Sequence, residues 1–309
     1  MKFVDVKNDI AFRKIFGNER KTQILISFLN AILRLEGDKE IVGVTITNPY
    51  QLPRIAGEKA SIIDVRAIDK KGRQFVVEMQ VADVDGFDKR VQYYTCRDYS
   101  MQIERGEQYP LLKPTYFIGI LDFDFFESLT FLSHHIIVNG ETYEHKLKDI
   151  QFTFIELKKF NLKIDELKTL TEKWVFFIKN AENLELIPRN VEDEGLMEAY
   201  KDADKHSWKK EELIAYDNAS IAEQDEKGKL VAAENKGKIE GKIEGKIEGK
   251  IEGKIEGKIE GKIEEKEEVV ERCWEENMSI IVISKITNLP IEEIKRIIEK
   301  IKKRREGKK

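Results

Sequence analysis

Two acidic residues, Asp64 and Glu78, stand in neighbouring strand-like segments at positions where their carboxylates could meet. Between the segments, Gly72 falls at the third position of a three-residue hairpin loop, which takes a left-handed conformation. With such a loop Asp69 pairs with Arg73, and counting five residues back along each strand sets Asp64 opposite Glu78. Directly opposed residues share one face of a sheet, with Cβ atoms about 4.5–5.5 Å apart. The spacing therefore predicts two converging carboxylates.

Such a pair suggests metal chemistry, because two close carboxylates repel one another unless a cation or a proton lies between them. Mg²⁺ or Mn²⁺ would relieve the repulsion, since hard divalent ions take oxygen ligands. A bound ion of this kind polarises a phosphate and activates water, which is the chemistry of phosphodiester hydrolysis. Gln80 shares the face by the two-residue period of a strand. The alternative is that Asp64 and Glu78 are ordinary solvent-facing residues, and the pattern alone favours that alternative.

The elements that would position this pair lie in residues 1–190, which hold most of the aromatic residues and the β-branched runs. Strands interleaved with helices indicate an α/β or α+β domain with a mixed sheet. Residues 8–33 predict two helices with a break near Gly17. Further helices are expected at residues 87–104 and 164–180, and strands at residues 41–47, 60–68, 74–81, 115–121, 134–138 and 151–156.

Residues 191–235 are rich in Glu, Lys, Asp and Ala and predict a helical connector, and residues 236–264 hold seven tandem GKIE units. A period of four exceeds 3.6, so on a helix the isoleucine row drifts about 40° per unit and cannot form a heptad seam. Each Gly in a helix costs roughly 0.8–1 kcal/mol against Ala. A tolerated spacer is favoured over a paired rod, in which Gly would let a second backbone approach, and the sequence leaves the repeat's conformation open.

Residues 265–309 predict a small helix-turn-helix-like hairpin. Asn288 suits a left-handed cap and Pro290 suits the first turn of the second helix. The hairpin either contacts DNA, helped by its basic tail, or serves as a dimerisation or docking unit. The second interpretation is favoured because the second helix has few residues suited to reading base edges.

Composition restricts the remaining classes. Charged residues make up 36% of the 309-residue chain but the net charge is only −4, so a global basic footprint for nucleic acid is absent. Cys96 and Cys273 have no CxxC neighbour, which argues against a zinc site or a disulfide framework. Without a signal peptide or a long apolar segment, we expect no membrane contact and a cytoplasmic location.

Five ordered blocks in the first 180 residues carry a resemblance to a known family: KNDIAFRKIFG, SIIDVRAID, EMQ, FDKRVQYYTCRDY and IELKKF. Together they resemble the Rpn family of recombination-promoting nucleases, also described as PD-(D/E)xK transposases. The C-terminal ITNLPIEEI is similar to a helical motif at the end of many members. The resemblance implies a restriction-endonuclease-like core, DNA cleavage that depends on a divalent ion, and a role in recombination or against foreign DNA.

Carried over to this chain, the resemblance makes Asp64 and Glu78 metal ligands and the carbonyl of Met79 a third. Gln80 stands where the wider superfamily has a lysine. That replacement removes a positive charge that would orient the water and stabilise the transition state, so slow or conditional cleavage is expected.

Four further residues are candidates for supporting roles. Asp9 resembles an acidic residue that completes such sites through water, although it also suits the start of a helix. Lys59 is a candidate compensating cation, but its odd spacing from Asp64 places it on the other strand face without a bulge. Arg90 would contact a phosphate and Tyr94 would donate a hydrogen bond; alternatively they are a snorkelling Arg and a core-edge Tyr.

The functional hypotheses therefore differ in class. The favoured one is a metal-dependent DNA endonuclease, and the alternative is a catalytically weak or inactive DNA-binding or assembly protein that keeps the nuclease fold. The repeat or the C-terminal unit would join copies in a homo-oligomer. A third hypothesis, implied by the resemblance, makes the region from Met197 onward a regulatory C-terminal fragment.

Overall fold

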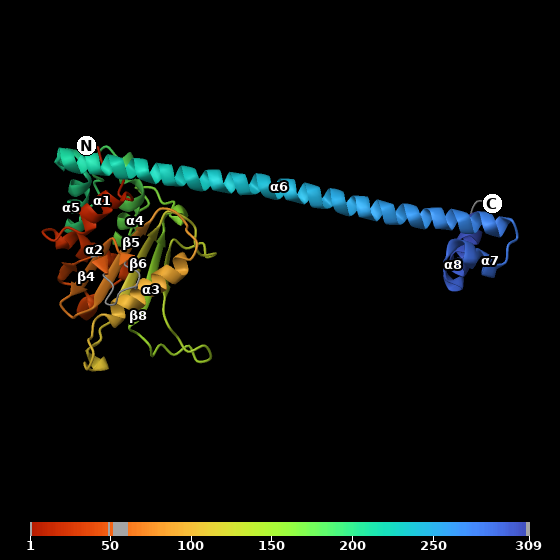
Figure 1. Cartoon of the computed structure of the whole chain (residues 1–309). Coiled ribbons are helices and arrows are strands. Elements are labelled where there is room, and N and C mark those ends of the chain that lie inside the picture. Colours follow the sequence, from red (N-terminus) through yellow and green to blue (C-terminus); the bar gives the residue numbers. More distant parts are fainter. Residues whose placement is uncertain (1, 49, 52–60, 307–309) are drawn as a thin grey trace. The chain divides into compact units, whose positions relative to one another are not determined.

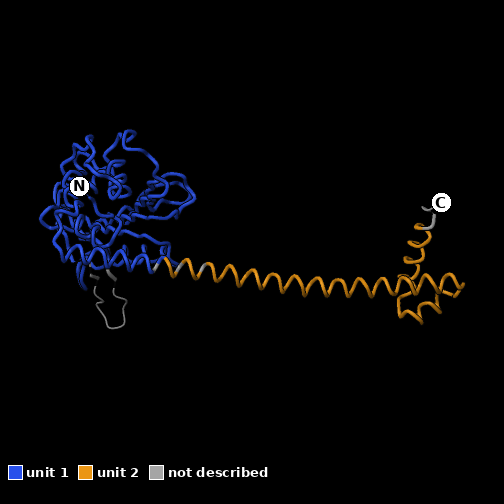
Figure 2. Tube along the Cα trace, turned by 90° about the horizontal axis from the view of Figure 1, so that it is seen from above, with its two compact units in different colours: residues 1–227 blue, residues 228–309 orange. Residues whose placement is uncertain are grey.

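The computed structural model describes residues 2–48, 50–51 and 61–306 (Figure 1). Contacts divide the chain into two compact units, residues 1–227 and residues 228–309 (Figure 2). The first unit holds the mixed sheet and the second holds the repeat and the C-terminal helices. Among the described residues, no helix combines the length and the apolar character that spanning a membrane requires.

A six-stranded mixed sheet forms the centre of the first unit, in the order β1-β4-β5-β6-β8-β7. Strands β5, β6 and β8 run parallel to one another, and the pairs β1–β4, β4–β5 and β7–β8 are antiparallel. The predicted fold class is confirmed. The strands are β1 (Val44–Thr47), β4 (Val65–Asp69), β5 (Gln74–Gln80), β6 (Thr115–Leu121), β7 (Leu132–His135) and β8 (Ile150–Glu156), with a separate pair β2 (Tyr50–Gln51) and β3 (Ser61–Ile62).

Helices cover both faces of this sheet (Figure 1). One face packs against α1 (Asp9–Phe16), α2 (Thr22–Leu33), α4 (Leu170–Asn180) and α5 (Glu194–Ala203). Helix α3 (Phe87–Ser100) covers the other. Because side chains alternate along a strand, β5 contributes Val77 to the first core and Val76 to the core under α3. The strand that carries the candidate Glu78 is thus anchored from both sides.

Local signals explain where the elements begin and end. Asn8 caps α1 by accepting hydrogen bonds from the N–H groups of Ile10 and Ala11. Helix α4 begins six residues later than predicted, at Leu170, because Thr169 and Glu172 form a capping box there. Gly72 has the predicted left-handed conformation, with φ of 81°.

The first unit extends beyond the boundary expected at residue 190, because α5 and the beginning of α6 (Lys210–Glu275) pack on it. Leu196, Ala199 and Tyr200 on α5 are buried in the main core. Trp208 and Tyr216 follow, and the Tyr216 hydroxyl accepts a hydrogen bond from the N–H of Asp5 at 2.9 Å. This part of the expected connector therefore stabilises the unit.

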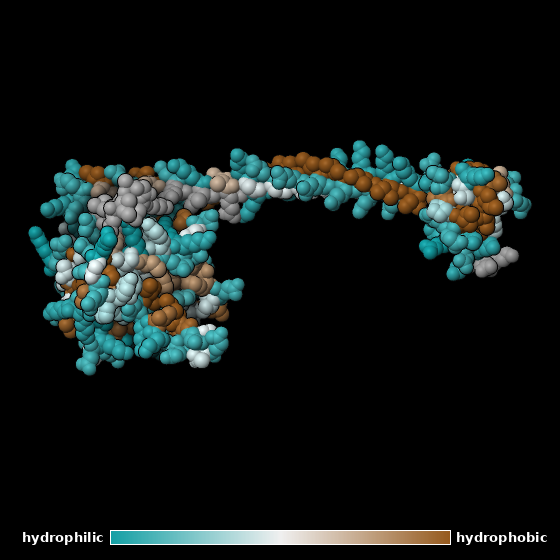
Figure 3. Space-filling view, turned by 60° about the horizontal axis from the view of Figure 1, so that its bottom comes forward, coloured by the Kyte–Doolittle hydropathy of each residue, from teal (hydrophilic) through white to brown (hydrophobic). Residues whose placement is uncertain are grey.

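The GKIE repeat is helical throughout, as part of α6. Within the second unit its apolar side chains form a visible band on the helix (Figure 3). The seven isoleucines from Ile239 to Ile263 are each 53–61% exposed. The repeat is therefore helical although its row of isoleucines is not buried.

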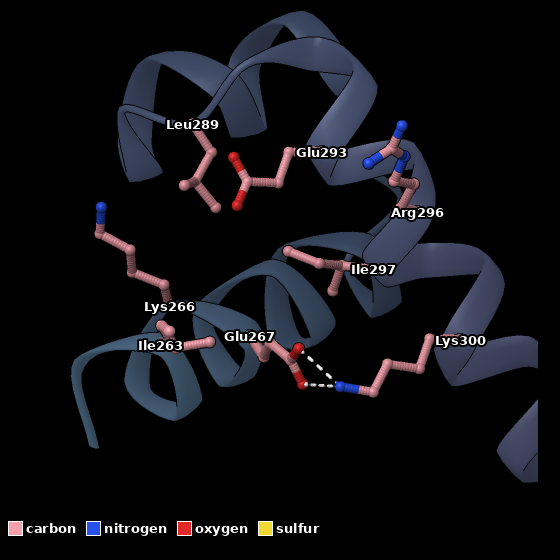
Figure 4. A pocket seen from close by; sticks show the side chains of 8 residues that line it. All are labelled: Ile263, Lys266, Glu267, Leu289, Glu293, Arg296, Ile297 and Lys300. Atoms are coloured by element: carbon pink, nitrogen blue, oxygen red, sulfur yellow. Dashed lines mark hydrogen bonds and ion pairs between the residues drawn. The ribbon is translucent and has the colours of Figure 1, made fainter. Parts of the chain in front are cut away.

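The C-terminal unit contains the predicted helical hairpin, and the end of α6 packs on it as a third helix. Helices α7 (Ile280–Thr287) and α8 (Ile291–Glu306) pack Ile283, Ile294 and Ile298 against Val270 at the end of α6. Asn288 ends α7 in the predicted left-handed conformation. A hollow of about 360 Å³ lies between α6 and α8, where Lys300 pairs with Glu267 at 2.7 Å (Figure 4).

Candidate active site

Asp64 and Glu78 meet where the pairing of β4 with β5 ends. The last paired residues are Val65 and Val77, so the observed register is the predicted one. The chain bends at Asp64, and its N–H lies 3.4 Å from Glu78 Oε2. Asp64 Oδ2 accepts a hydrogen bond from the N–H of Met79 at 2.8 Å. The carboxylate of Asp64 thus replaces the backbone acceptor that a continued strand would offer.

The two acids affect one another electrostatically. Burial, followed by repulsion from Asp64, raises the pKa of Glu78 to about 8, against the opposing charges of Arg90 and Arg13. The Glu78 carboxyl is therefore mainly protonated at neutral pH when no cation lies between the acids. The side chain of Asp64 is only 5% exposed. The spacing in the sequence predicted this repulsion between the two carboxylates.

Arg13, a residue that our sequence reasoning missed, reaches the pair from α1. Its Nε and Nη2 donate to Asp64 Oδ1 at 3.0 and 2.8 Å. Its Nη2 also lies 3.6 Å from Asp9 Oδ2, one helical turn earlier. The i, i+4 spacing of Asp9 and Arg13 was a signal for their mutual contact. The contact with Asp64, 51 residues away in sequence, had no such signal.

Arg90 and Tyr94 on helix α3 lie beside β5. Arg90 Nη2 donates a hydrogen bond to Gln80 Oε1, and Gln80 Nε2 donates to the carbonyl of Ala82 at 2.8 Å. Burial, with a smaller contribution from the charge of Glu78, raises the pKa of Tyr94. Arg97, one turn further on, instead donates to the Tyr93 hydroxyl at 3.2 Å. Arg90 and Tyr94 therefore flank the carboxylate pair.

Of the two remaining supporting candidates, only Asp9 lies in the part of the chain that the structure describes. The side chain of Asp9 is 60% exposed and approaches Arg13 instead of the carboxylate pair. Lys59 lies outside the described residues. Across the described ranges, no group of three or more His, Cys, Asp or Glu side chains is arranged to hold a metal ion. Any ion at this site would take its further ligands from the backbone or from water.

The donor atoms at the pair fit a hard divalent ion. Within an antiparallel ladder, the N–H and C=O of one residue point to the same neighbour. Because the N–H of Met79 faces Asp64, its carbonyl faces the same gap, while Gln80 uses its carbonyl on the other side to accept from Asp122 at 2.9 Å. Two carboxylates and a carbonyl are the oxygen ligands that Mg²⁺ and Mn²⁺ prefer. Arg13 occupies one oxygen of Asp64 and would have to yield it.

The chain matches a known protein family. A family model described as PD-(D/E)XK nuclease family transposase matches residues 6–233. The matched range contains Arg13, Asp64, Glu78, Gln80 and Arg90, and it ends before the first GKIE unit. No curated protein and no solved structure matches the chain.

Proposed function

We propose that this chain, which belongs to the PD-(D/E)XK nuclease family transposases, is a divalent-metal-dependent DNA endonuclease. The family assigns a nuclease-like domain with a restriction-endonuclease-like fold, and the mixed sheet with helices on both faces agrees with it. One observation carries the proposal. Asp64 and Glu78 converge at the end of a strand pair, where the backbone of Met79 faces the same gap.

Asp64, Glu78 and the carbonyl of Met79 would hold Mg²⁺ or Mn²⁺. When bound, such an ion supplies polarisation of the phosphate and activation of water for phosphodiester hydrolysis. The protein's own residues set the conditions for this binding. Glu78 must lose its proton to become a ligand, because its pKa is raised to about 8. Arg13 must release Asp64 Oδ1, and the nearby carboxylate of Asp9 can retain the guanidinium.

DNA is the proposed substrate, on the strength of the family and of the local charge. The chain is slightly acidic overall, with a net charge of −4. Arg13 on α1 and Arg90 on α3 nevertheless place two guanidinium groups beside the carboxylate pair. Guanidinium groups bind phosphate oxygens through paired hydrogen bonds. We propose that cleavage serves recombination, or acts on foreign DNA.

Nicking of supercoiled plasmid by the full chain tests this proposal, with Mg²⁺, Mn²⁺ or EDTA. Asp64→Asn should lower the rate by at least about a hundredfold while the protein stays folded, because the amide keeps an acceptor for the N–H of Met79 but loses its charge. Asp88→Asn, an exposed change on α3, is the matched control and should cut like the parent. Equal rates for Asp64→Asn and the parent would refute the site.

A second candidate function is DNA binding without turnover, which Gln80 favours because it is neutral where the superfamily has lysine. In that case no divalent ion supports nicking, yet the protein binds DNA. Binding should weaken steeply with salt, because phosphate contacts release counterions. Gel-shift titrations in EDTA at several salt concentrations distinguish this case from a protein with no affinity for DNA.

We also propose that the repeat joins two copies of the chain in parallel. Lys precedes and Glu follows every isoleucine, so the exposed isoleucine row has opposite charges on its two flanks. In a parallel pair the lysine flank of one helix faces the glutamate flank of the other, whereas an antiparallel pair sets like charges together. Because the isoleucine row drifts around the helix, two paired helices stay in contact over only a few GKIE units.

The third hypothesis, a regulatory fragment beginning at Met197, is kept as a proposal. Met197 lies on α5, whose Ala199, Tyr200 and Ala203 are buried in the first unit. A fragment that begins there would expose these side chains and could dock where α5 normally packs. Adding residues 197–309 to the full chain should then reduce nicking, and an unchanged rate would argue against the hypothesis.

A further inference from the structure

We infer that Arg90 provides the positive charge at the reacting phosphate that Gln80 cannot carry, and that Gln80 holds the Arg90 guanidinium in place. The inference rests on the proposed nuclease function and assigns the side chain that supplies the positive charge in its active site. It concerns a specific contact between α3 and β5, the hydrogen bond from Arg90 Nη2 to Gln80 Oε1.

Gln80 is fixed at both ends of its amide. Its Nε2 donates to the carbonyl of Ala82 at 2.8 Å, so its Oε1 is oriented toward Arg90. In this orientation Gln80 is an acceptor for a cation from another element. The position that holds lysine in the superfamily thus receives a guanidinium from α3, two residues along the strand from Glu78.

Arg90 is anchored in three ways. Its backbone N–H donates to the carbonyl of Gly86 at 2.9 Å in the first turn of α3, and its guanidinium lies 5.3 Å from the ring centre of the buried Phe87. The third anchor is Gln80. A guanidinium over an aromatic face keeps its N–H groups free at the edge. The side chain is therefore held in place while donors remain for a ligand.

Arg90 forms no close ion pair with a carboxylate among the residues that the structure describes, since its side-chain contacts are with neutral Gln80 and Phe87, and its charge acts on Glu78 only at longer range. Arg13 differs, because its guanidinium pairs with Asp64 and approaches Asp9. Of the two guanidinium groups beside the carboxylates, Arg90 is the one available for an anion. Its five donors form a fork that matches phosphate oxygens.

A purely structural role for Arg90 is the competing explanation, in which the side chain only covers Phe87. The two explanations predict different outcomes when a lysine at position 80 is used to compensate for the loss of Arg90. If charge at this place matters, an ammonium introduced on β5 should substitute for the lost guanidinium. If packing matters, a lysine at position 80 cannot replace a side chain that covers Phe87.

The test compares Arg90→Ala, Arg90→Lys and the double variant Arg90→Ala with Gln80→Lys, using Lys89→Ala as the control for an exposed charge on the same helix. Cleavage is measured on a defined duplex with Mg²⁺ or Mn²⁺. Arg90→Ala should lower kcat by about a hundredfold or more with little change in KM, as for loss of a transition-state donor. Gln80→Lys should recover at least tenfold, and Arg90→Lys should lose less than Arg90→Ala. A folded double variant no faster than Arg90→Ala overturns the inference.

DNA affinity in EDTA separates this inference from the proposed function. If the parent does not cleave and Asp64→Asn changes nothing, the nuclease proposal fails, but a phosphate contact by Arg90 is still measurable. Arg90→Ala should then reduce the slope of log affinity against log salt by about one unit, and adding Gln80→Lys should restore it. An unchanged slope in Arg90→Ala overturns the inference in that case.

Discussion

At the scale of single residues, the proton on Glu78 should make the metal-free protein sensitive to pH. The pKa of Glu78 in the folded protein is about 8, above the ordinary carboxyl value of 4.5. The folded state therefore binds this proton more tightly than the unfolded state does. Its contribution to stability is complete below about pH 4.5 and is lost as pH rises toward 8. In EDTA, the melting temperature of Glu78→Gln should fall less than that of the parent between pH 5 and 8.

The same proton should oppose a divalent ion, so affinity for Mn²⁺ should increase up to about pH 8, where Glu78 ionises. Calorimetric titration in two buffers of different ionisation enthalpy would detect the released proton. Affinity that is independent of pH would contradict the assignment of Glu78 as a ligand. The exposed Asp88→Asn variant should behave like the parent in both measurements.

Arg13 should stabilise the metal-free protein and weaken metal binding. Its guanidinium neutralises Asp64, whose side chain is nearly inaccessible to water. Arg13→Ala leaves that carboxylate buried without its cation, at a cost of roughly 1–3 kcal/mol, reduced by the partial exposure of Arg13. Added Mg²⁺ or Mn²⁺ should therefore raise the melting temperature of Arg13→Ala more than that of the parent. Arg20→Ala is the control, since Arg20 is exposed and distant in sequence from the pair. Equal shifts in all three proteins would contradict a competition between Arg13 and the ion.

At the scale of elements, local sequence signals predicted most of the strands. They did not predict which side chains from other elements contact those strands. The loop at Gly72 fixed the register of β4 and β5, and hence the meeting of Asp64 with Glu78, because turn chemistry acts over a few residues. The approach of Arg13 depends on how α1 packs across the sheet, and no local propensity encodes that.

The C-terminal helices favour a docking unit over a DNA-reading one. In helix-turn-helix proteins the first residues of the second helix contact base edges. Here α8 begins with Ile291, Glu292 and Glu293, and two carboxylates at this end would repel phosphate. The basic side chains of Lys302, Lys303 and Arg304 lie at its other end. The arrangement supports the interpretation favoured from the sequence.

Self-association of the full chain should depend on the exposed isoleucines of the helical repeat. Changing Ile247, Ile251 and Ile255 to Ser should weaken self-association of the full chain, because these side chains supply the exposed apolar row. The matched control changes Gly245, Gly249 and Gly253 to Ala on the opposite side of the helix, which should raise helix content without weakening association. Sedimentation velocity over a range of concentrations measures both. A parent that remains monomeric throughout would rule out the proposed pairing.

At the scale of the whole molecule, the division into two units predicts where the chain can be cut. Residues 1–227 should fold alone with one cooperative transition, since they form a compact unit with its own core. Ending the chain at residue 190, where composition alone placed the boundary, would remove Leu196, Ala199, Tyr200, Ala203 and Trp208 from that core. Composition misses these contacts because a helix rich in charges can still bury one narrow face.

The cost of that shorter truncation can be estimated from the buried side chains. The larger of them contribute roughly 1.5–3 kcal/mol each, and a domain of this kind is stable by only about 5–15 kcal/mol. We therefore expect residues 1–190 to be unfolded or aggregated, as judged by circular dichroism and urea titration, while residues 1–227 retain a cooperative transition. If the nuclease site is complete, residues 1–227 should also nick plasmid DNA, and Asp64→Asn in the same fragment should not. A folded 1–190 fragment with the parent's stability would show that α5 is dispensable for the fold.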